Sequence, residues 1–126
     1  GQMGARFGTA VTTGDVTGDA LPDLLVGAPQ YTHDQSREGR IFLYLGVPGG
    51  LSASPGWTSE GDKAESAYGL SANLDGDVNG DGYNDLEIGA PQYRINHDIV
   101  GRALVYLGAA EVMDPAVVYL PLVCRE

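Results

Sequence analysis

The chain repeats itself at an offset of 62 residues, and this duplication limits the folds available to it. Three pairs of segments match at this offset: GDVTGD and GDVNGD at 14–19 and 76–81, GAPQY at 27–31 and 89–93, and YLG at 44–46 and 106–108. Agreement at three separate places indicates an internal duplication. A repeat of about this length is typical of propellers and solenoids.

Each copy contains short β-type segments separated by turn-forming residues. Residues 24–26 and 86–88 are followed directly by the GAP sequence, which punctuates strands. Residues 41–45 and 103–107 are continuous apolar runs of strand length. Such runs indicate strands covered on both faces, as when one propeller blade packs on the next. No segment shows helical periodicity between capping signals.

The sequence therefore predicts an all-β fold made of two four-stranded β-propeller blades, residues 1–62 and 63–126. Trp57 and Tyr119 share the repeat offset and indicate a fourth, outer strand in each blade. Propellers need about four to eight blades to close, and each blade of a pair leaves an apolar face for a neighbour. We expect either further blades in a longer chain or self-association.

Oxygen-bearing side chains alternate in two nine-residue segments, 15–23 (DVTGDALPD) and 77–85 (DVNGDGYND). Calcium binds about 6–8 oxygens at roughly 2.3–2.6 Å from a flexible loop. Alternation lets a tight loop turn every second side chain toward one centre. Two Ca²⁺ sites are predicted, with position seven contributing its backbone carbonyl. The predicted ligands are Asp15, Thr17, Asp19, Leu21 and Asp23 in the first loop, and Asp77, Asn79, Asp81, Tyr83 and Asp85 in the second.

The second loop is the better predicted site. Asn79 supplies an amide oxygen, and Gly82 relaxes the turn at position six. The first loop has only the hydroxyl of Thr17 at position three, with Ala20 at position six and Pro22 at position eight. We therefore expect calcium to bind the first loop more weakly.

Two other kinds of loop share part of this sequence pattern. Asp, Asn and Gly also dominate metal-free Asx turns, but two loops with the same spacing between strands favour a metal. An EF-hand or dockerin loop requires an acidic ligand at position twelve and flanking helices. Position twelve is Val26 in the first copy and Ile88 in the second, and the flanks are β-type segments.

Composition excludes several partners. The chain has 17 acidic and 7 basic residues, a formal net charge of -10, which argues against nucleic acid and anionic membranes. No apolar run is long enough to insert into a membrane. Cys124 is the single cysteine, so no intrachain disulfide can form. The start at Gly1 suggests truncation, and the apolar segment 116–122 near the end suggests a true C-terminus.

Phe7-Gly8 with the GAP at 27–29, and Tyr68-Gly69 with the GAP at 89–91, resemble the two signatures of FG-GAP repeats. These repeats form the β-propeller head of integrin α subunits. They also occur in many secreted bacterial proteins and in a glycosylphosphatidylinositol-specific phospholipase. The resemblance implies an extracellular adhesion module, of about seven blades if integrin-like. A secreted bacterial-type member of the family is expected.

No catalytic set is found: the sequence lacks a Gly-x-Ser-x-Gly elbow, a P-loop and paired metal-binding histidines. His33 and His97 each precede an aspartate but are interpreted as exposed loop residues. The expected function is non-catalytic recognition of a protein or glycan ligand outside the cell, where calcium is millimolar. The resemblance places the calcium loops opposite the ligand face, so the candidate binding segments are 32–38 and 94–100. The alternatives are an accessory propeller of a secreted hydrolase and a purely structural spacer.

Overall fold

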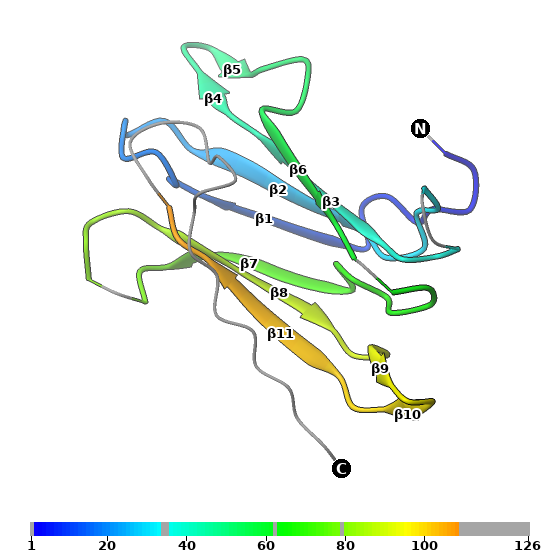
Figure 1. The fold of residues 1–126 in the computed structure, drawn as a ribbon. Coiled ribbons are helices and arrows are strands. Elements are labelled where there is room, and N and C mark those ends of the chain that lie inside the picture. The colour runs from blue at the N-terminus through cyan, green and yellow to red at the C-terminus, as the bar shows by residue number, and fades with distance from the viewer. Residues whose placement is uncertain (1, 34–35, 62, 79, 109–126) are drawn as a thin grey trace.

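The computed structural model of the chain describes residues 2–33, 36–61, 63–78 and 80–108. Two twisted antiparallel sheets lie side by side, with a small hairpin extending from each (Figure 1). These residues contain strands and turns but no helix, and hence none long and apolar enough to cross a membrane. The all-β prediction is confirmed.

The first sheet, here called the first blade, has four strands in the order β1-β2-β3-β6. They are β1 (Ala10–Gly14), β2 (Asp23–Ala28), β3 (Arg40–Tyr44) and β6 (Trp57–Glu60). Trp57 does begin the outer strand, where it pairs with Leu43. A hairpin of β4 (Gly46–Val47) and β5 (Gly50–Leu51) interrupts the path from β3 to β6.

The second sheet, the second blade, repeats this arrangement. Its order is β11-β8-β7, from β7 (Ser71–Gly76), β8 (Asp85–Ala90) and β11 (Arg102–Tyr106). β9 (Arg94–Ile95) and β10 (Asp98–Ile99) form a hairpin inside the segment predicted to be a binding loop. The fourth strand expected around Tyr119, and Cys124, lie outside the described residues.

The two blades share one core. Strands β1 and β7 run side by side in the centre of the molecule (Figure 1). The largest fully buried apolar side chains come from both blades: Leu25, Ile41 and Leu43 from the first, and Leu74, Leu86 and Ile88 from the second. Gly27 permits this close approach, because a Cβ at that position would lie 2.1 Å from the carbonyl oxygen of Gly69.

Coverage of strand β3 differs from the expectation of two buried faces. Ile41 and Leu43 are buried, whereas Phe42 and Tyr44 on the other face are partly exposed. Strand β11 behaves alike, with Leu104 buried and Ala103 exposed. The physical reason is that each blade has a neighbour on one side only within the described residues.

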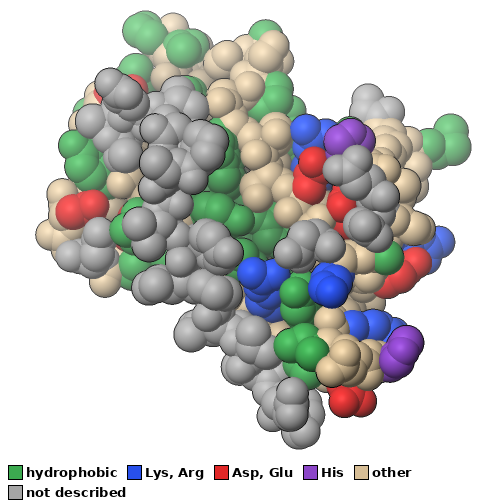
Figure 2. All heavy atoms as spheres, viewed as in Figure 1, with side chains coloured by type: hydrophobic (Ala, Val, Ile, Leu, Met, Phe, Trp, Pro, Cys, Tyr) green, Lys and Arg blue, Asp and Glu red, His purple; other side chains and the backbone are tan. Residues whose placement is uncertain are grey.

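Antiparallel pairing separates the two predicted functional regions. The β1–β2 and β7–β8 turns, which contain the aspartate loops, lie at one end of the sheets (Figure 1). The connections from β2 to β3 and from β8 to β11 lie at the opposite end. On the face drawn in Figure 2, most of the visible Lys, Arg and His side chains lie toward the end of the molecule that bears the β9–β10 hairpin.

Candidate metal centres

Asp15 organises the first aspartate loop. Its Oδ1 accepts hydrogen bonds from the N–H groups of Gly18 (2.8 Å) and Asp19 (3.2 Å), and its Oδ2 accepts one from Ala20 (2.8 Å). Asp19 Oδ1 in turn accepts from the N–H of Leu21 at 2.9 Å. Hydrogen bonds from backbone N–H groups to the carboxylates of Asp15 and Asp19, two predicted ligands, therefore hold the conformation of the loop.

Asp23 fixes the end of this loop to the blade. The side chain is completely buried at the start of β2, where Oδ2 accepts from the N–H of Val16 (2.9 Å) and Oδ1 from that of Gly46 (2.8 Å). Burial raises the pKa of the Asp23 carboxyl, and these two hydrogen bonds partly oppose the shift. The nearby carboxylates of Asp19 and Asp15 raise its pKa further.

The second loop repeats all six of these hydrogen bonds. Asp77 accepts from the N–H groups of the residues three, four and five positions later, at 2.9, 3.2 and 2.9 Å. Asp81 accepts from the N–H of Tyr83 at 3.0 Å. Buried Asp85 accepts from Val78 (2.7 Å) and Gly108 (2.8 Å). The hydrogen bond from the N–H of Gly82 is the main cause that lowers the pKa of Asp77.

The carboxylates converge most closely in the second loop. One oxygen from each of Asp77, Asp81 and Asp85 lies within 4.8 Å of the other two, whereas Asp15, Asp19 and Asp23 form no such group. Three carboxylates at these distances fit a hard divalent cation, which takes oxygen ligands.

The first loop has a different feature that fits a bound cation. The Oγ1 atom of Thr17, at position three, is buried and has no hydrogen-bond partner among the described residues. A buried hydroxyl without a partner is costly, and an ion in the loop is one group that could satisfy it. Asn79, the corresponding residue in the second loop, lies outside the described residues. The proposed roles of the Leu21 and Tyr83 carbonyls stay predictions.

Backbone conformation distinguishes the two loops at position six. Ala20 has φ of 68°, in the left-handed region, while Gly82 has φ of 91°. The left-handed conformation strains a residue with a Cβ but not glycine. That Ala20 weakens calcium binding by the first loop stays a prediction, and this strain is the physical reason for it.

Sequence reasoning missed Gly46 and Gly108 as parts of the sites. Each donates its N–H to the buried aspartate at position nine of its loop, from just beyond the end of the strand β3 or β11. The signal was present, because both are the last residue of the duplicated YLG segment.

The two histidines have different surroundings. Nδ1 of His33 lies 2.8 Å from Oε2 of Glu60, an ion-pair distance. Exposed His97 is in the two-residue turn of the β9–β10 hairpin, where Asn96 and His97 both have positive φ, as a type I′ turn requires. The interpretation of both as simple exposed loop residues is thus incomplete for His33.

The FG-GAP repeat family matches residues 7–44 and 69–106, which together are more than half of the chain. The chain belongs to the FG-GAP repeat family. The two matched segments coincide with the first three strands of each blade, so the sheets are β-propeller blades.

Integrin α subunits are similar to this FG-GAP chain. Integrin alpha-PS2 of Drosophila melanogaster is 39% identical over an alignment of 121 residues that covers 90% of this chain and 8% of that protein. Integrin alpha-IIb of Mus musculus is 35% identical over 120 residues (90% and 11%), and integrin alpha-8 of Homo sapiens is 37% identical over 112 residues (85% and 10%). The chain thus spans about a tenth of these relatives. All three are animal proteins, so the expectation of a bacterial-type member is not supported.

Proposed function

We propose that this chain is a calcium-stabilised, non-catalytic part of an extracellular β-propeller that acts in cell adhesion. The observation behind the proposal is the pair of aspartate loops, which fold with the same six hydrogen bonds in two FG-GAP repeats. The similarity to integrin α subunits supports an adhesive role at the cell surface.

The calcium ions would be structural. Each loop joins the first two strands of its blade, β1 to β2 or β7 to β8. Its last aspartate also accepts a hydrogen bond from Gly46 or Gly108, just beyond strand β3 or β11. A cation would offset the repulsion among the three carboxylates of each loop, and it would hold the loop between its two strands in one conformation. Binding to the folded state alone then raises stability by mass action.

Recognition would take place at the opposite end, through segments 32–38 and 94–100. The β9–β10 hairpin presents the exposed side chains of Arg94, Asp98 and Ile99 around a two-residue turn. The ligand would be a protein or a glycan. Binding energy at such surfaces is concentrated in a few residues, most often Trp, Tyr and Arg, and Arg94 is the exposed arginine of this hairpin.

Calorimetry with Ca²⁺, together with thermal melting in calcium and in chelator, tests the metal part of the proposal. We expect two sites and a higher Tm in millimolar calcium. Asp81→Ala should remove the tighter site and Asp19→Ala the weaker one. Asp98→Ala, which removes an exposed carboxylate on β10, is the matched control and should change neither. A Tm that is the same with and without calcium contradicts the proposal.

Adhesion is tested by coating a surface with the chain and measuring cell attachment, with a glycan array in parallel. Arg94→Ala combined with Ile99→Ala should reduce attachment or glycan binding, while the calcium-dependent Tm stays unchanged. A chain that binds calcium but neither cells nor glycans is a structural spacer, and the adhesive part of the proposal is then wrong.

A further inference from the structure

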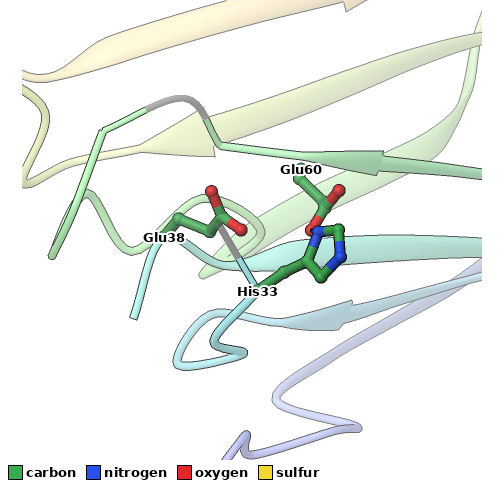
Figure 3. Close-up of side chains that lie close together, drawn as sticks. All are labelled: His33, Glu38 and Glu60. Atoms are coloured by element: carbon green, nitrogen blue, oxygen red, sulfur yellow. Dashed lines mark ion pairs between the residues drawn. The ribbon is translucent and has the colours of Figure 1, made fainter. Parts of the chain in front are cut away.

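Three side chains that can bind a metal converge at the end of the blades opposite the aspartate loops (Figure 3). His33 lies in the connection that follows β2, Glu38 lies two residues before β3, and Glu60 is the last residue of β6. One nitrogen or oxygen atom of each lies within 4.8 Å of the others, and Nδ1 of His33 is 2.8 Å from Oε2 of Glu60. None of the three belongs to the predicted calcium sites.

The cluster is anchored to the core of the molecule. Glu38 is 2% exposed, and its carbonyl accepts hydrogen bonds from Ser66 Oγ (2.9 Å) and from the N–H of Tyr68 (3.3 Å). Beside Glu60, the N–H of Gly61 donates to the carbonyl of Gly39 at 3.0 Å. Two of the three side chains therefore extend from backbone that is held in place. His33 is more exposed, which leaves the cluster open to solvent.

The charges of the cluster favour a cation. Two carboxylates this close repel each other, and burial of one of them removes the screening by water. Oε2 of Glu60 is buried and accepts no hydrogen bond within the described part of the chain. The nearby Nδ1 of His33 lies at hydrogen-bond distance but without the alignment of a hydrogen bond. A divalent ion would give the buried Oε2 of Glu60 a partner of opposite charge.

We propose that His33, Glu38 and Glu60 form a binding site for a divalent transition metal ion, best represented by Zn²⁺. Imidazole nitrogen suits zinc and its neighbours in the first transition row, whereas calcium prefers oxygen. Three protein ligands leave a fourth position of a tetrahedral zinc ion for water. A tetrahedral ion with ligands at about 2.0–2.1 Å separates them by about 3.3 Å. The 2.8 Å between His33 and Glu60 thus needs only a small rearrangement.

Titration of the full chain with ZnCl₂ in saturating calcium, at a pH where imidazole is neutral, tests this site. The calcium keeps the aspartate loops occupied. We expect one zinc ion per chain, with affinity lowered at least about tenfold by His33→Ala and by Glu60→Gln, because losing even an outer-shell partner of a metal ligand costs about 10–100-fold in affinity. The control variant is His97→Ala, which removes the exposed histidine of the equivalent connection in the second blade. This variant should bind zinc with the affinity of the unmodified chain.

Proton NMR of the two imidazole rings identifies the ligand directly. The ring signals of His33 are identified as those that are missing from the spectrum of His33→Ala. Zinc should shift these signals and leave the ring signals of His97 unchanged. An unchanged calcium-dependent melt shows that the His33 variant is folded. The proposal is overturned if zinc fails to bind at about 1 mM, if His97→Ala abolishes binding, or if Asp81→Ala does so, because the last result would assign zinc to the second aspartate loop.

Discussion

The backbone N–H of Asn84 donates a hydrogen bond of 3.1 Å to the carbonyl oxygen of Asp15, and so joins the two aspartate loops. The ring of Tyr83 packs over Gly18, where a Cβ would lie 2.6 Å from its Cε1 atom. Position seven of the second loop therefore rests on position four of the first. A substitution in one loop should therefore affect the conformation or stability of the other loop.

Gly18→Ala and Gly80→Ala test this contact as a matched pair. Both glycines occupy position four with nearly equal φ, 73° and 71°, but only at Gly18 would the added methyl meet Tyr83. Each variant should lose about 1–2 kcal/mol from the left-handed backbone, and Gly18→Ala should lose more. Urea unfolding measures the difference.

Tyr83→Ala should recover part of the extra loss when it is combined with Gly18→Ala, because the clash is then absent. The two loops are structurally independent if Gly18→Ala and Gly80→Ala cost the same and the double variant is additive.

Position six allows a reciprocal exchange between the loops. Ala20→Gly relieves a left-handed alanine and should strengthen the first site, whereas Gly82→Ala introduces the same strain in the second. An energy of about 1 kcal/mol corresponds to about a fivefold change in calcium Kd. Calorimetry should show the two affinities move toward each other. If Ala20→Gly weakens the first site, backbone strain is not what limits it.

Much of the repeat architecture was predictable because the family signatures pair with each other in space. The N–H of Gly8 donates to the carbonyl of Gly27 at 3.1 Å, and that of Gly69 donates to Gly89 at 3.0 Å. The FG and GAP segments of each copy thus form one local hydrogen-bonded unit. The residues that form this unit occur in both copies, and their recurrence in the sequence indicated the duplication.

Other features could not be predicted because they depend on contacts between distant residues. His33 meets Glu60 only after β3 and β6 have paired, and at the repeat offset the second copy has Ile95 and Leu122 in their places. The β9–β10 hairpin was missed because Asn96-His97 is a less common type I′ turn than Asn-Gly. The duplication indicated which residues repeat, and it gave no signal for those that differ.

Tyr68 should make the fold sensitive to alkaline pH. Burial raises the pKa of its phenol well above the usual value, and the hydroxyl hydrogen-bonds to Ser59 Oγ (3.0 Å) and the Tyr106 hydroxyl (3.3 Å). The unfolded chain loses this proton near pH 10 while the folded chain retains it, so the free energy of unfolding falls as pH rises above about 10.

Tyr68→Phe should flatten that alkaline decline, and it should cost about 1 kcal/mol at neutral pH through the lost hydrogen bonds. Urea unfolding at pH 7 and at about pH 10.5 measures both effects. Tyr44→Phe, on the partly exposed face of β3, is the control and should leave the pH dependence unchanged. An equally steep decline in Tyr68→Phe would assign the alkaline sensitivity to another group.

The uncovered face of the first blade should cause the isolated chain to self-associate. An open groove of about 600 Å³ on this face is lined mainly by aromatic side chains. Phe7 and Phe42 meet edge to face there at 5.3 Å between ring centroids, and Phe7 is 55% exposed. Its lining residues are Gln2, Ala5, Phe7, Tyr31, Phe42 and Tyr44. A propeller would cover such a face with the neighbouring blade.

Sedimentation velocity in calcium, over a range of chain concentrations, measures this association. Burial of apolar surface stabilises contacts by roughly 25 cal/mol per Å², so an aromatic groove of this kind should draw chains together as concentration rises. Phe7→Glu places a charge in the groove and should shift the distribution toward monomer. Val47→Glu changes an exposed apolar residue of the β4–β5 hairpin, away from the groove lining, and should leave association unchanged. A wild-type chain that stays monomeric at every concentration and melts cooperatively would mean that the two blades bury enough surface against each other to be stable alone.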